Sequence, residues 1–191
     1  MAAHKKKAAR LGAHLVFADE SGFLLIPNIA KTWAPIGETP VIEHPYKRDK
    51  ISLISGVSVS PKQQHLSLYY LLFYENIGHE EVILFLRELL RHLRGEVVIL
   101  LDNSTIHKGE PIEEFQRLHP RLHVEYFPFY APDLNPDEGV WGQAKQSLAN
   151  GCSKDLEELT EDVMRAMNAI KSSPDKLRAC IAASELPFFL S

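Results

Sequence analysis

Apolar and polar residues are arranged along the first part of the chain in ways that predict three strands. Residues 14–26, "HLVFADESGFLLI", have a strand pattern that we expect to bend through Ser21 and Gly22. Residues 50–60 alternate apolar and small polar side chains, which predicts a second strand. Residues 66–74, "LSLYYLLFY", form an apolar run rich in aromatic residues, which predicts a buried strand.

The hydrophobic period then changes to that of a helix. Over residues 82–93 the apolar side chains recur at helical spacing, and Gly95 ends this amphipathic helix. Residues 96–103, "EVVILLDN", contain five consecutive apolar residues, which indicates a strand covered on both faces. We expect a short helix over residues 110–118 and a further strand over residues 122–128.

Three more helices are predicted towards the end of the chain. The first covers about residues 135–150, and the last spans residues 174–184. The second covers residues 155–171 and begins with Asp155 and Glu158 as a capping pair.

The predicted order is β-β-β-α-β-α-β-α with extra helices at the C-terminal end. Three consecutive strands favour an antiparallel meander, whereas the later β-α-β steps require parallel neighbours joined by right-handed crossovers. The sequence therefore predicts an α/β fold with a mixed five-stranded sheet and helices on both faces.

Length, charge and cysteine content narrow the class of protein. The chain has 191 residues, enough for one domain with its own core, and a formal net charge of −4. This charge argues against a protein whose main task is to coat nucleic acid, but it is compatible with an enzyme that meets DNA through bound cations. Two cysteines, Cys152 and Cys180, are too few for a disulfide framework, so we expect a reducing cytoplasm. No segment has the pattern of a signal peptide or a transmembrane helix.

Two carboxylates are candidates for chemistry. Asp102 ends a buried strand at the carboxyl edge of the sheet, where open α/β folds place their active sites, although it could instead begin a turn. Asp19 lies late in the first strand, and its neighbour Glu20 points to the opposite face because strand side chains alternate. If the first strand lies beside the Asp102 strand, Asp19 and Asp102 converge.

A third acid is expected in the segment "FPFYAPDLNPDEGVW". It contains three acids, Asp133, Asp137 and Glu138. In one interpretation Asn135 caps a helix and Glu138 reaches back to the cap; in the other, one of the acids holds a metal ion. Three carboxylates with open coordination positions suit Mg²⁺, and two such ions roughly 4 Å apart can assist hydrolysis of a phosphodiester.

Three segments resemble the catalytic domain of the mariner-type DDE transposases, most closely the bacterial insertion-sequence branch. They are "FADESGF", "ILLDNSTIHKG" and "YAPDLNPDEGVW", of which the third is the most specific, and "WAPIGETP" adds to them. The resemblance covers residues 13 to about 150. It implies a ribonuclease-H-like fold, which agrees with the order of elements above.

The resemblance also implies a catalytic and metal-binding triad. Its first aspartate falls on Asp19 of "DESG" and its second on Asp102 of "LDN"; its glutamate, which follows Asn-Pro and any residue, falls on Glu138 rather than Asp137. Asp102 and Glu138 are 36 residues apart, which is close to the usual spacing in the family. Asp133 matches a commonly acidic position that is not a ligand. The triad would bind two Mg²⁺ ions, for which Mn²⁺ substitutes.

By this resemblance residues 13–151 form a DDE catalytic domain, residues 1–12 a mobile basic arm, and residues 152–191 a helical extension packed on the domain. The implied function is Mg²⁺-dependent hydrolysis and strand transfer at transposon ends. The alternative is an inactive remnant that binds DNA or dimerises. Family members usually begin with helix-turn-helix segments, so a separately encoded DNA reader is one expected partner.

Transposon and target DNA are the other expected partners, bound by a homodimer or larger synaptic assembly at the bacterial nucleoid in the cytoplasm. The loop between Pro27 and Arg48 is our candidate for a protein contact. His107 could touch DNA or orient Asp102, and each of the other candidates could instead be a turn residue or a solvated side chain. The candidate DNA contacts are Asn103, His107, Lys145, Lys47, Arg48 and Lys50.

Overall fold

A computed structural model of the chain describes residues 2–26, 29–39, 41, 49–62, 65–129, 131–151 and 153–184. Within these residues, five strands form one sheet in the order β3-β2-β1-β4-β5. Their bounds are His14–Leu24 for β1, Lys50–Val59 for β2, Leu66–Phe73 for β3, Val97–Leu101 for β4 and Leu122–Tyr126 for β5. The longest strand, β1, therefore occupies the middle of the sheet.

The pairing of the strands confirms the predicted mixed sheet. β1, β2 and β3 form an antiparallel meander, whereas β4 lies parallel to β1 and β5 lies parallel to β4. Strands β4 and β5 each follow a connection that contains a helix, as parallel strands require.

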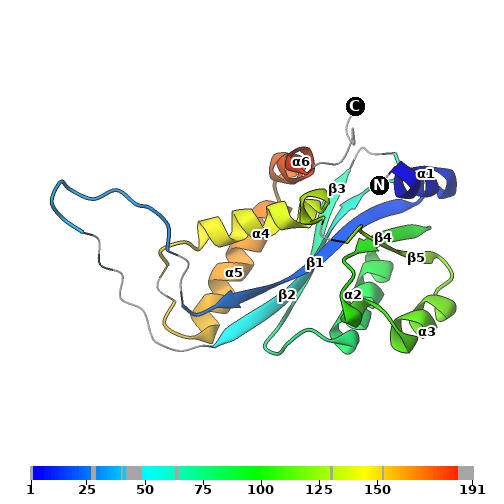
Figure 1. The fold of residues 1–191 in the computed structure, drawn as a ribbon, viewed down its shortest axis with the longest axis horizontal. Coiled ribbons are helices and arrows are strands. Elements are labelled where there is room, and N and C mark those ends of the chain that lie inside the picture. The colour runs from blue at the N-terminus through cyan, green and yellow to red at the C-terminus, as the bar shows by residue number, and fades with distance from the viewer. Residues whose placement is uncertain are drawn as a thin grey trace.

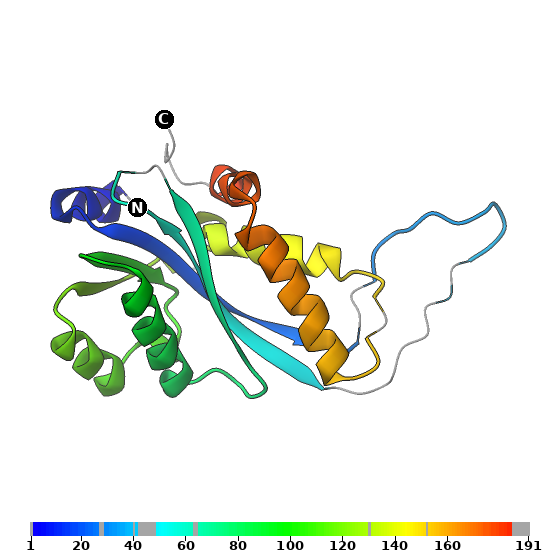
Figure 2. The same ribbon diagram turned by 180° about the vertical axis from the view of Figure 1, so that it is seen from behind.

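Helices cover both faces of this sheet, as predicted (Figure 1). Helices α4, α5 and α6 pack on one face, and α2 and α3 pack on the other, which Figure 2 shows from behind. The helical elements are α1 (Ala2–Leu11), α2 (His79–His92), η1 (Thr105–His107), α3 (Glu110–Leu118), η2 (Pro132–Leu134), α4 (Pro136–Ser147), α5 (Leu156–Lys171) and α6 (Pro174–Ala183).

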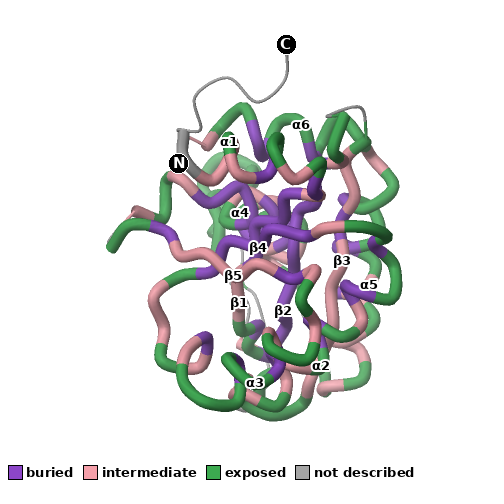
Figure 3. The backbone as a smooth tube through the Cα atoms, turned by 90° about the vertical axis from the view of Figure 1, so that its right-hand side faces the viewer, coloured by how far each residue is buried: buried purple, intermediate pink, exposed green. Residues whose placement is uncertain are grey.

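Alternation along β1 divides the core into two layers. Leu15 and Phe17 face the layer that contains α4, α5 and α6, whereas Val16 and Ala18 face the layer that contains α2 and α3. All four side chains are buried, and the central strands are the most buried part of the chain (Figure 3). The same alternation sends Asp19 and Glu20 to opposite layers, which determines what each can contact.

The first twelve residues, which were expected to form a mobile basic arm, are mostly helical. They include helix α1, because alanine and lysine are strong helix formers and because Ala8 is buried against the core. The Lys7 ammonium lies 2.5 Å from the Glu125 carboxylate on β5, which fixes the helix further. The expected bend in β1 is also wrong: Ser21 and Gly22 stay in register with β2, so the strand continues to Leu24.

The third strand is less buried than its aromatic sequence predicted. β3 is at the edge of the sheet, and only Leu68 among its residues is fully buried. Helix α4 ends at Ser147, somewhat earlier than expected, and α6 ends at Ala183. Apolar composition alone does not show how far other elements cover a strand, and it does not define the last residue of a helix.

The two C-terminal helices pack on α4. Gly139 allows α6 to approach closely, because a Cβ at this position would lie about 3.1 Å from Cys180. Helix α5 begins with the predicted capping pair: the Asp155 side chain accepts from the Glu158 N–H, and the Glu158 carboxylate accepts from the Lys154 N–H. The division into arm, catalytic domain and extension stays a prediction. None of the helices in the described ranges combines the length and apolar character needed to span a bilayer.

Candidate active site

Three carboxylates line one pocket at the edge of the two central parallel strands. Asp19 lies in the middle of β1, Asp102 follows β4 directly, and Glu138 is in the first turn of α4. The pocket has a volume of about 250 Å³. Asp19 and Asp102 converge because β1 and β4 are parallel neighbours, and the register that pairs Phe17 with Leu100 brings the end of β4 beside Asp19 in the middle of β1.

Asn135 fixes the start of α4 beside Asp19. Its side-chain oxygen accepts from the Asp137 N–H at 3.1 Å, and its amide nitrogen donates to the Ala18 carbonyl of β1 at 3.3 Å. The Asn135 backbone N–H donates to the Pro132 carbonyl at 2.8 Å, so it is not bonded by the Glu138 carboxylate. The cap and the pocket acid are therefore different residues, and Glu138 is exposed at the pocket.

Asp137 points away from this pocket into the protein. Its side chain is fully buried, and the Ser55 hydroxyl donates to Oδ2 at 2.6 Å, while Oδ1 has no hydrogen-bond partner among the described residues. Burial, with the charges of Asp19, Glu20 and Glu138, raises the pKa of Asp137 well above its usual range, although the Ser55 hydrogen bond opposes the shift. A fully buried acid outside the lining of the pocket fits a packing role, so Glu138 is the third acid of the pocket.

The acids of the pocket repel one another. Burial, together with the charges of Glu20, Glu138 and Asp102, raises the pKa of Asp19 to about 7. Because like charges oppose ionisation, a cation placed among these carboxylates would favour their charged forms.

The carboxylates of the pocket are the type of ligand that a hard divalent cation prefers, although the structure does not arrange them around a common point. No three His, Cys, Asp or Glu side chains in the described ranges are placed to hold an ion together. Asp102 explains part of this, because its Oδ1 accepts from the Ser104 N–H at 2.8 Å and lies 2.7 Å from His107 Nδ1. The donor set is nevertheless all carboxylate oxygen, which Mg²⁺ and Mn²⁺ prefer.

The His107 side chain is completely buried, so it presents no surface for a DNA contact. It lies between two acids, with Nδ1 facing Asp102 and Nε2 2.8 Å from Glu20 Oε1. Burial disfavours a charged ring, but the hydrogen bond and charge of Glu20 and the charge of Asp102 outweigh it and raise the pKa of His107. Of the two roles considered from sequence, only the contact with Asp102 agrees with this geometry.

Asn103 is also occupied within the protein. Its amide nitrogen donates to the Phe127 carbonyl at 2.5 Å, and its oxygen accepts from the Lys108 ammonium at 2.9 Å. Asn103 lines the carboxylate pocket, so it shapes the wall of the pocket beside Asp102. These bonds indicate a structural role and leave a DNA contact as a prediction.

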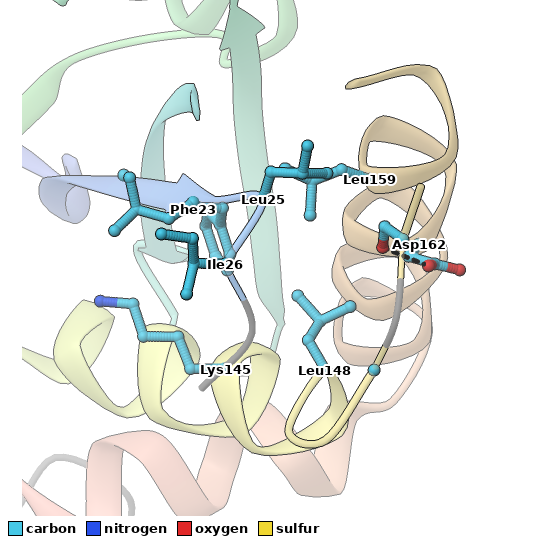
Figure 4. Close-up of a pocket in the computed structure, with 11 residues that line it drawn as sticks. Phe23, Leu25, Ile26, Lys145, Leu148, Leu159 and Asp162 are labelled. Carbon is cyan, nitrogen blue, oxygen red and sulfur yellow. Dashed lines mark hydrogen bonds between the residues drawn. The ribbon is translucent and has the colours of Figure 1, made fainter. Parts of the chain in front are cut away.

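Lys145 lies too far along α4 to reach the carboxylate pocket as it stands. It is seven residues after Glu138, which corresponds to about 10 Å along a helix axis. Instead it lines a second pocket of about 290 Å³ with Phe23, Leu25 and Leu148 (Figure 4). Its ammonium is 5.9 Å from the centre of the Phe23 ring.

The remaining basic candidates are only partly described. Lys47 and Arg48 lie outside the described residues. Lys50 is exposed at the start of β2, and its ammonium donates to the Asn76 side chain. A DNA contact by this cluster therefore stays a prediction.

Sequence reasoning missed two residues at the mouth of the pocket. Phe129 is exposed and lines the pocket, and the Lys108 ammonium lies 5.5 Å from the centre of its ring. An exposed aromatic side chain beside a cation suits a stacked base. The sequence contains this aromatic residue directly before "YAPDLNP", but it does not show that the side chain is exposed at the pocket.

Comparison with known proteins identifies the family and the fold of the chain. The family described as DDE superfamily endonuclease matches residues 14–160. Curated protein sequences give no match.

Solved structures of Mos1 transposase share the fold. The paired-end complex with the left transposon end has a TM-score of 0.58 and 19% identity over 95% of this chain and 59% of that chain. The paired-end complex with Mn has a TM-score of 0.56 and 19% identity over 96% and 60%. The mariner catalytic domain alone has a TM-score of 0.54 and 17% identity over 96% and 89%. The chain thus spans about 60% of the length of the first two, and the expected ribonuclease-H-like fold is confirmed.

Proposed function

Because the chain belongs to the family of DDE superfamily endonucleases, we propose that it is the catalytic domain of a DNA transposase. It would hydrolyse a phosphodiester at each transposon end. The freed 3′-hydroxyl would then attack a phosphodiester of the target DNA in line, which joins the two strands and releases the 3′-oxygen of the target strand. The observation that carries this proposal is the meeting of Asp19, Asp102 and Glu138 in one pocket. The likeness to a transposase bound to its transposon end supports DNA as the substrate.

Asp19, Asp102 and Glu138 would hold two divalent cations, with Mg²⁺ as the natural ion and Mn²⁺ as a substitute. Bound ions would supply Lewis-acid stabilisation of the charge that develops on the phosphate oxygens. A Mos1 complex with Mn supports a divalent ion in this fold.

The chain's own residues prepare the pocket. Asn135 holds the first turn of α4 against β1, which keeps Glu138 beside Asp19. Asp19, with its pKa at about 7, releases a proton when a cation binds, so binding should be tighter at pH 8 than at pH 6. Phe129 at the pocket mouth would stack on a base next to the scissile phosphate.

Cleavage of DNA by the wild-type chain tests this function. A labelled duplex without transposon sequence, incubated with Mg²⁺ or Mn²⁺, should accumulate nicks, and a chelator should prevent them. Binding of the duplex without cleavage under either ion would contradict the enzyme and would favour the alternative, an inactive DNA-binding or dimerisation remnant.

The excursion between β1 and β2 is our candidate for the contact with a second copy of the chain. Its described residues, 29–39 and 41, contain no helix or strand and extend away from the body of the protein (Figures 1 and 2). Its large apolar side chains are exposed, and Trp33 is 100% exposed. Asn150 anchors its base through two hydrogen bonds with the Ala30 backbone, at 2.9 and 3.1 Å. Tryptophan is one of the residue types most enriched at interface hot spots, and Trp33 is free to contact a partner.

Replacing Trp33 by alanine should weaken self-association of the chain on a DNA duplex that contains no transposon sequence. A hot-spot side chain contributes about 2 kcal/mol or more, so the dimer dissociation constant should rise by roughly 30-fold. Sedimentation of the wild type and of Trp33→Ala checks this, with Leu118→Ala on α3 as a control for loss of another exposed apolar side chain. Equal association of all three proteins would exclude Trp33 from the interface.

The further partners belong to the same proposal. The homodimer would act at transposon ends together with a helix-turn-helix reader encoded separately. A transposase of the bacterial branch would work in the cytoplasm, on the DNA of the nucleoid.

A further inference from the structure

Asp102 is held from behind by a buried histidine and a second acid. The His107 side chain has no exposed surface, with Nδ1 2.7 Å from Asp102 Oδ1 and Nε2 2.8 Å from Glu20 Oε1. Nδ1 donates its hydrogen bond to the Asp102 backbone carbonyl at 3.3 Å and makes a close charged contact with the Asp102 carboxylate, whereas Nε2 bonds Glu20. A ring nitrogen bonds an oxygen only when it carries a hydrogen, so His107 donates from both nitrogens. Its contacts with the two carboxylates are short, as expected for charge-assisted pairs.

Strand alternation explains how Glu20 reaches this position. Asp19 faces the α4 side of β1 and enters the carboxylate pocket, whereas Glu20 faces the other side, towards η1. The Tyr126 hydroxyl donates to the His107 carbonyl at 2.8 Å, which holds η1 against β5. Adjacent acids of one strand thus approach Asp102 from two sides.

The contacts of the Asp102 carboxylate fall on one of its oxygens. Oδ1 accepts from the Ser104 N–H and lies 2.7 Å from His107 Nδ1, which also bonds the Asp102 backbone carbonyl, and Oδ2 has no hydrogen-bond partner in the described part of the chain. We propose that Glu20 and His107 are positioning residues, which hold Asp102 Oδ1 so that Oδ2 can bind the divalent cation. This rests on the proposed function. Glu20 would then contribute to the metal site, although it is not one of the three metal ligands.

The alternative is that the buried chain Glu20–His107–Asp102 only stabilises the fold. Two replacements of His107 separate these roles. Asparagine puts an amide nitrogen near the place of Nδ1 and can still donate to Asp102, whereas glutamine puts its amide near Nε2 and reaches towards Glu20. Both variants remove the ring and its charge, and they differ in the amide that remains and in one methylene group. Asparagine leaves the larger cavity, so tighter Mn²⁺ binding by His107→Asn than by His107→Gln would come from its bond to Asp102 and not from better packing.

Titration of Mn²⁺ into the metal-free proteins, followed by calorimetry, tests the proposal. Loss of a hydrogen bond to a metal ligand weakens metal binding about 10- to 100-fold, so His107→Gln should bind Mn²⁺ at least tenfold more weakly than His107→Asn. Glu20→Gln, which keeps an acceptor for Nε2, should weaken Mn²⁺ binding less than His107→Gln does. Melting temperatures measured without metal show the structural effect of each change.

The outcomes are distinguishable. Equal Mn²⁺ affinity of the wild type, His107→Asn and His107→Gln would overturn the positioning role and leave the metal site standing. Lower melting temperatures with that equal affinity would make the histidine purely structural. No Mn²⁺ binding by the wild type would overturn the proposed function and, with it, this inference. Should either His107 variant fail to fold, unchanged Mn²⁺ affinity in Glu20→Gln would count against the role of Glu20.

Discussion

Asp102→Asn is expected to remove metal-dependent DNA cleavage while the fold survives. The Asp102 side chain is 53% exposed at the end of β4, so its replacement leaves no cavity. Asparagine keeps the shape, and its oxygen can still accept from the Ser104 N–H, but it loses the charge that a cation requires. A bound metal stabilises the transition state by several kcal/mol, which at about 1.4 kcal/mol per factor of ten corresponds to roughly a thousandfold or more in rate.

The rate of nicking of a labelled duplex in Mg²⁺, together with circular dichroism, measures both parts of this expectation. Asp133→Asn is the matched control, because Asp133 is an exposed acid on η2 close to the same pocket but outside it. Cleavage by Asp102→Asn at the wild-type rate would remove Asp102 from the metal site. A similar loss in Asp133→Asn would mean that general negative charge, rather than a ligand, is what matters.

Glu138→Gln is expected to abolish cleavage to a similar extent, and Asp137→Asn is expected to spare it. Glu138 is exposed at the pocket and does not bond the cap, so glutamine changes its charge without disturbing α4. Asp137 is buried against Ser55, and its replacement leaves amide hydrogens without partners. That costs about 1–3 kcal/mol of stability but does not alter the pocket charge. Nicking rates of the two variants, measured side by side, decide between adjacent acids; a reversed result would shift the third ligand to Asp137.

The buried acids also predict how stability depends on pH without metal. The folded pKa of Asp19, about 7, lies above its ordinary value of 3.8, and the folded pKa of Asp137 is shifted in the same direction. The unfolded chain therefore loses these protons first, and stability falls as pH rises from about 4 to about 7. The melting temperature of Asp137→Asn should fall less over this range than that of the wild type.

Much of the fold follows from hydrophobic period and end signals. The five apolar residues before Asp102 could be recognised as a central strand, because parallel strands are buried on both faces. The Asn135-Pro136 start fixed α4 within one residue, because a cap side chain and a first-turn proline are local features. Two of the pocket acids could therefore be located before the structure was known.

The rest depends on contacts between distant segments. The role of His107 could not be fixed, because its partner Glu20 is 87 residues away and the ring is buried only when η1 folds against β1. The prediction that β3 is buried was wrong, because aromatic residues are common in both central and edge strands and do not distinguish the two. Lys145 shares a helix with Glu138, but periodicity does not show that its side chain lies in a different pocket.

The central claim is that Asp19, Asp102 and Glu138 form one divalent-metal site, as expected for a DDE superfamily endonuclease. Calorimetric titration of Mn²⁺ at pH 8 into the metal-free wild type and into the triple variant Asp19→Asn, Asp102→Asn, Glu138→Gln tests it most directly. The wild type should bind Mn²⁺, and the triple variant should show no binding while remaining folded. Binding of Mn²⁺ by the folded triple variant with the affinity and stoichiometry of the wild type would contradict the claim.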